Sequence, residues 1–377
     1  MSGGLDSTAM AGMAADIFRR EPNTIPSIVV ISALFGDLPC DESKYVEAAL
    51  QRLPFPSRQF DGRGGLYTLD NLREDMRRHE WPVLHRQGPL FMAFREAARL
   101  CGARILLNGL GGDELTTDYR YYKVPMKRGN PLGILRAAHL VQQVERMSLG
   151  NSLYLLSREA CPEEVKRPYR WVRRRFRPDL PPDWSTWLSP DFWKLAEELH
   201  STPDFPPQDF GSETLELAWR ILTNPGASWA NRFLVDEFAV AGVQCRFPFL
   251  DRRLFDLVFS IPDHLRPRCQ GRPWFKPLIS QGLASFLPPE IRLRDAKVDF
   301  GAYNCYVFDR CLEFLRPCLF DGPWKSEGFV PRSQAQGLFD SYIRPKQDWN
   351  HQTNDELKRM ETLRNIAGLE LWLRQIH

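Results

Sequence analysis

The first 125 residues predict an α/β fold, in which helices cover both faces of a parallel sheet. Apolar runs at 27–35 and 103–108 have the length and composition of buried strands. Segments with helical periodicity precede the first run and fill most of the chain between the two. Strands that alternate with helices of this length form parallel βαβ units.

The order of elements follows from the positions of the apolar residues. A helix over about 7–20 is predicted because Met10, Met13, Ala14 and Ile17 fall on one helical face. The elements after it alternate in the same way: a strand at 27–35, a helix at 41–53 that Asp41 can cap, a strand at 57–61, helices at 69–79 and 88–102, and a strand at 103–108.

The rest of the chain predicts helical additions to this 1–125 core. Residues 126–215 are rich in Pro and Trp and carry helical patterns such as "PLGILRAAHLVQQVERM", which predicts a helical insertion. Residues 216–305 contain further helices and tight turns, and residues 306–377 are helical and partly amphipathic in pattern.

The composition of the 377-residue chain is that of a globular protein, with 43% hydrophobic and 26% charged residues. A net charge of +3 is too mild to predict nucleic-acid binding. The longest apolar run, 25–35, is too short to cross a bilayer, so no membrane association is expected. The eight cysteines show no CxxC pair and no regular spacing, which favours a reduced, cytoplasmic protein.

The stretch "SGGLDST" at 2–8 has the composition of a phosphate-binding loop. Gly3 and Gly4 let backbone N–H groups turn toward an anion, and the helix that follows directs its positive N-terminus toward the same place. Hydroxyl residues add further donors: Ser2, Ser7 and Thr8. The carboxylate of Asp6 would repel a bare phosphate, so it predicts a bridging Mg²⁺.

A second glycine-rich stretch, "NGLGGDEL" at 108–115, follows a predicted buried strand and contains two adjacent carboxylates. Loops at the carboxyl ends of neighbouring parallel strands share one crevice. Asp6 and Asp113 are therefore expected to face one metal ion from two sides.

Four motifs together resemble the synthetase half of the glutamine-hydrolysing asparagine synthetases, which belongs to the PP-loop ATP pyrophosphatases. They are "SGGLDS", "GLGGDEL", "RFPFLD" and "RLRDAKVDF", which occur in the family's order and cover about residues 2–305. The resemblance implies a PP-loop parallel sheet that binds MgATP, with residues 216–305 completing the active site. It also implies that a carboxylate is adenylated, pyrophosphate leaves, and a nitrogen nucleophile displaces AMP to form an amide.

The resemblance carries site residues over by position. Asp6 and Asp113 would bind Mg²⁺, and Leu34 would lie near adenine. Asn108 and Gly109 would lie near the nucleoside. The residues that would hold the pyrophosphate moiety are Ser2, Gly3, Gly4, Asp6 and Ser7.

Three residues near the later motifs have a structural alternative. Lys297 would neutralise the departing pyrophosphate, which agrees with stabilisation of a developing anion by a fixed cation. A solvated surface lysine is the alternative for Lys297, and the surface interpretation is favoured for Arg294. Asp251 is expected to cap the helix that follows it.

Two positions depart from the family and bear on specificity. Leu110 and Gln244 stand where the family has glutamates, and the chain has no glutaminase domain. A carboxylate beside the reacting nitrogen could orient an amine or remove its proton, and leucine can do neither. These departures resemble the asparagine synthase-related branch that includes lasso peptide cyclases, which join a peptide's N-terminus to an Asp or Glu side chain. The start of the insertion, "RYYKVPMKRGNPLGILRAAH", is also similar to that branch.

The position of Met1 also departs from the family, because it stands where the last residue of the first strand is expected. A late start codon or a fragment would explain this, and we expect the first strand to be missing and the loop at 2–8 to be held less firmly.

Three weaker signals keep alternative interpretations. The stretch "KRPYRWVRRRFR" at 166–177 is either a solvated helix face or a docking surface for an acidic peptide or partner protein. His85 is expected to be structural rather than part of the active site. Tyr119, Tyr121 and Tyr122 either line the acceptor pocket or belong to the core.

The sequence therefore predicts an AMP-forming amide synthetase with ATP and Mg²⁺ as cofactors and a specialised, peptide-like carboxylate substrate. One alternative is an asparagine synthetase that takes ammonia from another source. The other is a truncated or degenerate family member that binds without catalysis.

Overall fold

The computed structural model describes residues 1–23, 27–79, 84–117, 210–262, 264–267, 276–294, 298–342 and 354–376, together with Pro82 and short pieces between 132 and 194. Most of the predicted insertion at 126–215 lies outside the described residues. The basic stretch 166–177, the three tyrosines near 120 and Lys297 also lie outside them.

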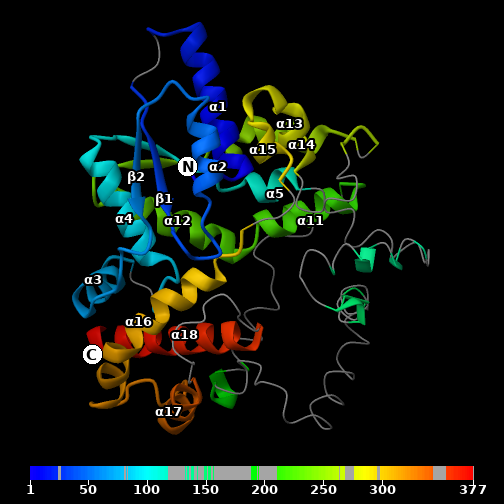
Figure 1. Cartoon of the computed structure of the whole chain (residues 1–377). Helices are drawn as coiled ribbons and strands as arrows, with labels where there is room; N and C mark the ends of the chain where they lie inside the picture. Colours follow the sequence, from blue (N-terminus) through cyan, green and yellow to red (C-terminus); the bar gives the residue numbers. More distant parts are fainter. Residues whose placement is uncertain are drawn as a thin grey trace.

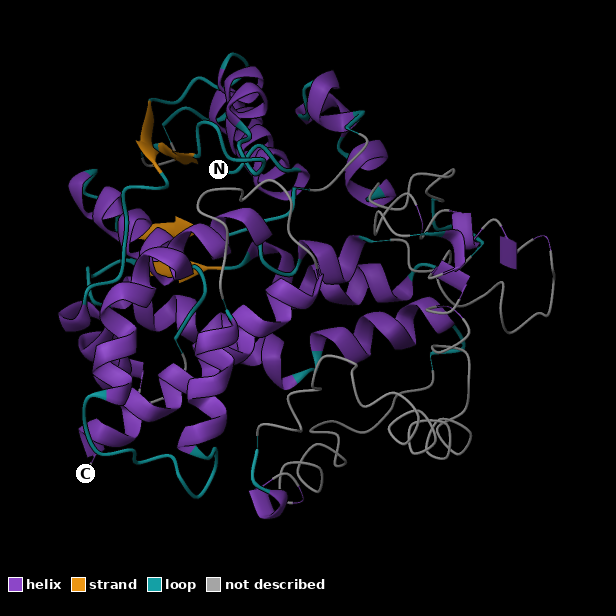
Figure 2. Cartoon of the chain, turned by 60° about the horizontal axis from the view of Figure 1, so that its bottom comes forward, coloured by secondary structure: helices purple, strands orange, loops and turns teal. Residues whose placement is uncertain are grey.

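The described strands form two separate parallel pairs (Figure 2). Strand β1 (Val30–Leu34) pairs with β2 (Ser57–Asp61), and β3 (Ile105–Leu107) pairs with β4 (Gln244–Arg246). Parallel pairing agrees with the prediction, and β2 has the predicted bounds. The two pairs do not join into one sheet, because no strand among the described residues links β1 to β3. The described residues before α1 contain no strand, which agrees with the expectation that the first strand is missing.

Strand β3 differs from the buried strand predicted at 103–108. Ile105 and Leu107 are 54% and 52% exposed, whereas Leu106 packs against the apolar cluster around Phe238. Successive side chains of a strand point to opposite faces, so one face of β3 is covered and the other is open. Apolar composition alone could not distinguish a strand covered on both faces from one covered on a single face.

Helix α1 (Leu5–Arg20) packs most closely through its small residues and only partly through the predicted apolar face. Met13 and Ile17 are exposed, whereas Ala9 and Gly12 are buried. A Cβ atom at Gly12 would lie 2.4 Å from the carbonyl oxygen of Phe286, so only glycine allows this close approach of η3. Of the four residues on the predicted face, Met10 and Ala14 pack against buried clusters, whereas Met13 and Ile17 do not, because the close approach of the backbones brings the side of α1 that carries Ala9 and Gly12 against η3.

Three further helices follow β1 and β2 in the predicted alternation along the chain: α2 (Ser43–Leu50), α3 (Leu69–His79) and α4 (Gly88–Leu100). Helix α2 begins two residues after Asp41. The Asp41 carboxylate accepts bonds from the Phe35 N–H at 2.7 Å and the Ser43 N–H at 3.1 Å. It therefore ties the end of β1 to the start of α2 rather than acting as the N-cap residue.

The remaining described helices lie in the second half of the chain. Those between the second glycine loop and residue 300 are α5 (Gly112–Thr116), α11 (Glu213–Leu222), α12 (Pro225–Ala239), η2 (Pro248–Leu250), α13 (Arg252–Ser260), α14 (Pro277–Gly282), η3 (Ala284–Phe286) and α15 (Pro289–Arg292). Asp251 caps α13 as predicted, because its side chain accepts a bond from the Arg253 N–H at 2.9 Å.

Three C-terminal helices and α3 enclose the most extensive apolar cluster: α16 (Gly301–Phe320), α17 (Arg332–Ser341) and α18 (Asn354–Ile376). In Figure 1 the three C-terminal helices lie below the strands, α1 and α2. Tyr303 and Leu315 of α16 and Leu363 of α18 are fully buried there. Among the described helices, none is both long and apolar enough to span a membrane.

Candidate functional site

The first glycine loop, residues 2–8, is held by hydrogen bonds between its hydroxyl groups and its backbone. The Ser2 N–H donates to Ser7 Oγ at 3.2 Å, and the Gly4 N–H donates to Ser2 Oγ at 3.3 Å. Gly3 has a φ of 74°, which favours glycine, and a Cβ there would lie 2.9 Å from Tyr45 Cβ. Because α1 begins at Leu5, the positive end of its dipole faces this loop.

The second glycine loop, residues 108–115, leads from β3 into α5. The Asn108 side chain braces the turn by accepting a bond from the Leu110 N–H at 2.9 Å. Gly111 has a φ of 92° and caps α5. Asp113 lies in the first turn of α5, and its side chain is 45% exposed.

The two glycine loops touch each other. A Cβ atom at Gly112 would lie 2.5 Å from Asp6 Oδ1, and one at Gly109 would lie 3.2 Å from Asp6 Cβ. Both glycines therefore leave room that the Asp6 carboxylate uses. Asp6 and Asp113 come from loops about a hundred residues apart, and the structure brings them together.

A third residue, Lys276, completes this arrangement. Its Nζ atom lies 2.9 Å from Asp113 Oδ1 and forms an ion pair with Asp6 Oδ2. Lys276 is only 7% exposed, although it directly precedes a helix start at Pro277. Lys276 was not predicted from the sequence, since a lone lysine before proline does not indicate contact with a residue 270 positions away.

We use the name two-loop site for residues 2–8, residues 108–115 and Lys276. Its two carboxylates share one cation, so their oxygens are close enough to act as ligands of one metal ion. Gly109 and Gly112 leave the room in which the Asp6 carboxylate lies beside the second loop. The adjoining N-terminus of α1 suits a phosphate.

An enclosed ion pair lies beside the first glycine loop, where a Cβ atom added at Gly3 would be 3.4 Å from Glu42 Cβ. Glu42 and Arg294 are joined by a charge-assisted hydrogen bond, and their side chains are 9% and 12% exposed. The guanidinium carbon of Arg294 lies 4.2 Å from the centre of the Tyr45 ring. Burial raises the pKa of Glu42, and the bond from Arg294 opposes that shift. The surface interpretation of Arg294 was therefore wrong, because the residue anchors its segment to α2.

The predicted departures from the family have identifiable surroundings. Leu110 packs against the apolar cluster that includes Phe233 and Phe238. The Gln244 side chain accepts a bond from Arg246 at 3.0 Å. Neither position supplies a carboxylate to the two-loop site.

Two other predicted residues lie apart from the two loops. Leu34 ends β1 and is half-buried, with Asp61 as its register partner. His85 stacks on Phe233 with ring centres 4.2 Å apart, and its Nδ1 accepts a bond from the Gln87 N–H. Burial lowers the pKa of His85 to about 3, so the ring is neutral, as expected for a structural histidine.

One cluster outside the two-loop site resembles a metal site in its ligand spacing. Asp75, His79 and Glu237 have ligand atoms within 4.8 Å of one another. However, Arg95 lies 2.6 Å from one oxygen of Glu237 and Arg78 lies 3.2 Å from the other. The arginines already neutralise the buried carboxylate, so the cluster is an ion-pair network that joins α3, α4 and α12.

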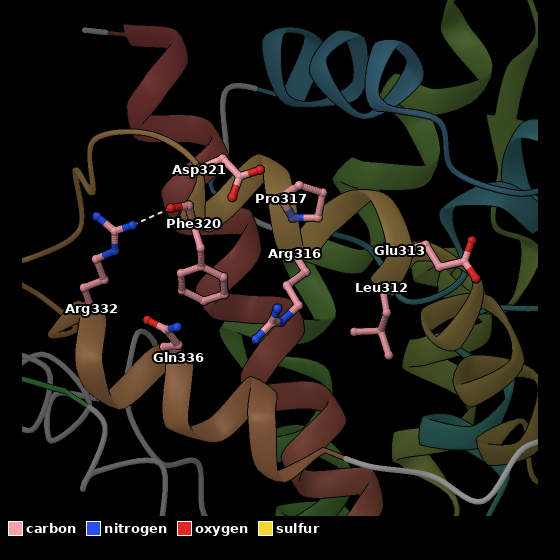
Figure 3. A pocket seen from close by; sticks show the side chains of 8 residues that line it. All are labelled: Leu312, Glu313, Arg316, Pro317, Phe320, Asp321, Arg332 and Gln336. Carbon is pink, nitrogen blue, oxygen red and sulfur yellow. Dashed lines mark hydrogen bonds between the residues drawn. The ribbon is translucent and has the colours of Figure 1, made fainter.

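A surface cavity of about 520 Å³ lies between α16 and α17 (Figure 3). Its lining mixes charges of both signs, and Arg332 donates a hydrogen bond to the Phe320 carbonyl at one end. None of its lining residues belongs to the elements that form the two-loop site.

No curated protein sequence matches the chain. A family model described as asparagine synthase matches residues 1–374, which is nearly the whole sequence. The chain therefore belongs to the asparagine synthase family.

Proposed function

We propose that this protein is an ATP-dependent, AMP-forming amide synthetase. Membership of the asparagine synthase family supports a ligase. One observation carries the proposal. The carboxylates of Asp6 and Asp113 come from two separate glycine loops and both contact the Lys276 ammonium, beside the N-terminus of α1. A metal-binding carboxylate pair next to a helix N-terminus is suited to hold the metal ion and the phosphates of MgATP during adenylation.

The proposal assigns roles to residues at the two-loop site. The loop from Ser2 to Ser7 would bind the pyrophosphate moiety of ATP, and Asp6 with Asp113 would hold Mg²⁺. Bound Mg²⁺ would neutralise negative charge on the phosphates. Asn108 and Gly109 would lie along the nucleoside, and Leu34 would contact adenine.

Charge on the leaving pyrophosphate also needs a fixed cation. Lys297 is assigned this role from the resemblance, and it lies outside the described residues. The preorganised positive charge would stabilise the anion that develops as the carboxylate attacks the α-phosphate. A nitrogen nucleophile would then displace AMP and form the amide.

The carboxylate substrate is proposed to be a specialised one, such as an Asp or Glu side chain of a peptide. The apolar packing of Leu110 supports this choice, because no carboxylate at that position can orient ammonia. A lasso-cyclase-like reaction is the specific form of the proposal. An ammonia-dependent asparagine synthetase and a non-catalytic binding subunit are the two rivals.

The test measures release of AMP and pyrophosphate from labelled ATP. The acceptors are L-aspartate with ammonium and a set of short peptides that contain internal Asp or Glu residues. Asp113→Asn is expected to abolish AMP release while the melting temperature stays near that of the wild type. Glu290→Gln removes an exposed carboxylate from α15 and serves as the matched control.

Each outcome discriminates between the candidates. AMP release with peptides and not with aspartate supports the proposal, and efficient asparagine formation supports the first rival. MgATP binding without AMP release under any condition supports the non-catalytic rival. AMP release that persists in Asp113→Asn contradicts the assignment of the metal carboxylates.

A further inference from the structure

The Lys276 ammonium lies between the two carboxylates that are proposed to hold a divalent cation. It contacts Asp6 Oδ2 and lies 2.9 Å from Asp113 Oδ1. The lysine side chain is 9% exposed, compared with 20% for Asp6 and 45% for Asp113. The ammonium is thus the most enclosed of the three charges.

The backbone of Lys276 is firmly held, which makes the side chain the part that can move. The Lys276 carbonyl accepts bonds from the Ser280 N–H and Ser280 Oγ, both at 2.8 Å. Pro277 follows as the first residue of α14, and α14 packs against both α1 and α5. The lysine therefore reaches into the two-loop site from a rigid helix start.

Charge explains why the ammonium and a metal ion compete. Two carboxylates carry two negative charges, of which one ammonium neutralises only one. A divalent cation would neutralise both and would use the same two oxygens at a shorter distance. The two cations cannot occupy this space together, because like charges so close repel strongly.

We propose that the Lys276 ammonium holds the divalent-cation position in the nucleotide-free protein, so that a free metal ion is excluded until the ammonium is displaced. The inference rests on the proposed function only for the identity of the displacing ligand. A nucleotide triphosphate offers the ammonium new negative partners, so the metal ion would enter together with the nucleotide rather than before it.

The experiment measures binding of Mn²⁺ alone to the nucleotide-free protein by electron paramagnetic resonance. Wild-type protein is expected to bind Mn²⁺ at this site with a dissociation constant of about 1 mM or higher. Lys276→Met removes the ammonium and is expected to tighten Mn²⁺ binding by tenfold or more, which corresponds to about 1.4 kcal/mol. The double variant Lys276→Met with Asp113→Asn is expected to lose that gain.

Two controls separate site occupancy from folding and from net charge. Lys358→Met removes the same charge from an exposed position on α18 and should leave Mn²⁺ affinity unchanged. Lys276→Gln is a second neutral variant whose amide can still donate to one carboxylate, in case Lys276→Met folds poorly. Folding of each variant is checked by its melting temperature.

Several results would overturn the inference. They are micromolar Mn²⁺ binding by the nucleotide-free wild type, no gain in a folded neutral variant, or an equal gain in Lys358→Met. None of these measurements involves catalysis. Absence of AMP release would therefore reject the proposed function but leave the competition between the Lys276 ammonium and the metal ion standing. An unchanged Mn²⁺ affinity in the Lys276 variants would reject the competition but leave the proposed function standing.

Discussion

Substitution of Gly112 by alanine is predicted to disable the two-loop site through a single methyl group. A Cβ atom there would lie 2.5 Å from both Cγ and Oδ1 of Asp6, and ordinary contacts begin near 3.4 Å. The Asp6 carboxylate would thus have to retreat by about 0.9 Å. The same movement would stretch the ion pair between Asp6 and Lys276 and separate Asp6 from Asp113.

The magnitude follows from how sharply catalysis depends on position. A displacement near 1 Å at a reacting centre costs about 10²-fold in rate, so Gly112→Ala should lower AMP release by that order. Overpacking of this kind costs about 1–3 kcal/mol of stability. The protein should remain folded, because Gly112 is the first residue of α5 and alanine is favourable in a helix.

The assay compares AMP release, MgATP affinity and the melting temperature of Gly112→Ala with those of Gly337→Ala. Gly337 lies inside α17, and no atom is within 4 Å of a Cβ added there. Its substitution should therefore leave AMP release unchanged and raise the free energy of unfolding by about 0.5–1 kcal/mol. Wild-type AMP release and nucleotide affinity in Gly112→Ala would refute the close approach of the two loops.

Three further predictions concern other parts of the molecule. Burial raises the pKa of Asp75 from 3.8 to about 6, so the native carboxyl binds its proton more tightly than the unfolded one. The free energy of unfolding, measured by urea titration, should therefore fall as the pH rises from 3.8 to about 6. Asp75→Asn should make this dependence of stability on pH less steep, and an unchanged dependence would contradict the prediction. Glu370 is fully buried and accepts bonds from the Ser326 N–H at 2.8 Å and from Arg374 at 2.6 Å. Glu370→Ala should cost about 3–5 kcal/mol, because it strands a partly buried cation, and an unaltered urea midpoint would count against that role. Incubation with aspartate, ATP and ammonium should yield little asparagine, since Leu110 supplies no carboxylate, and efficient asparagine formation would reverse this prediction.

The sequence predicted some residues of the candidate site and missed others. Glycines next to carboxylates predicted that Asp6 and Asp113 would meet, and the structure brings them together. Lys276 was not predicted, although it contacts both of them. Arg294 was assigned to the surface, whereas its partner Glu42 lies 252 positions away. A charged residue in a single sequence gives no indication of a distant partner.

The sequence by itself determined three features: the alternation of strands and helices through residue 115, the two glycine loops, and the helix cap at Asp251. These features depend on apolar periodicity, backbone freedom and side-chain bonding within a few residues. Only the tertiary structure decided that α1 packs through Ala9 and Gly12, that the strands form two separate pairs, and that Lys276 joins Asp6 to Asp113. Each of these depends on how closely two distant backbones approach, and that distance is set by the path of the whole chain rather than by any segment of it.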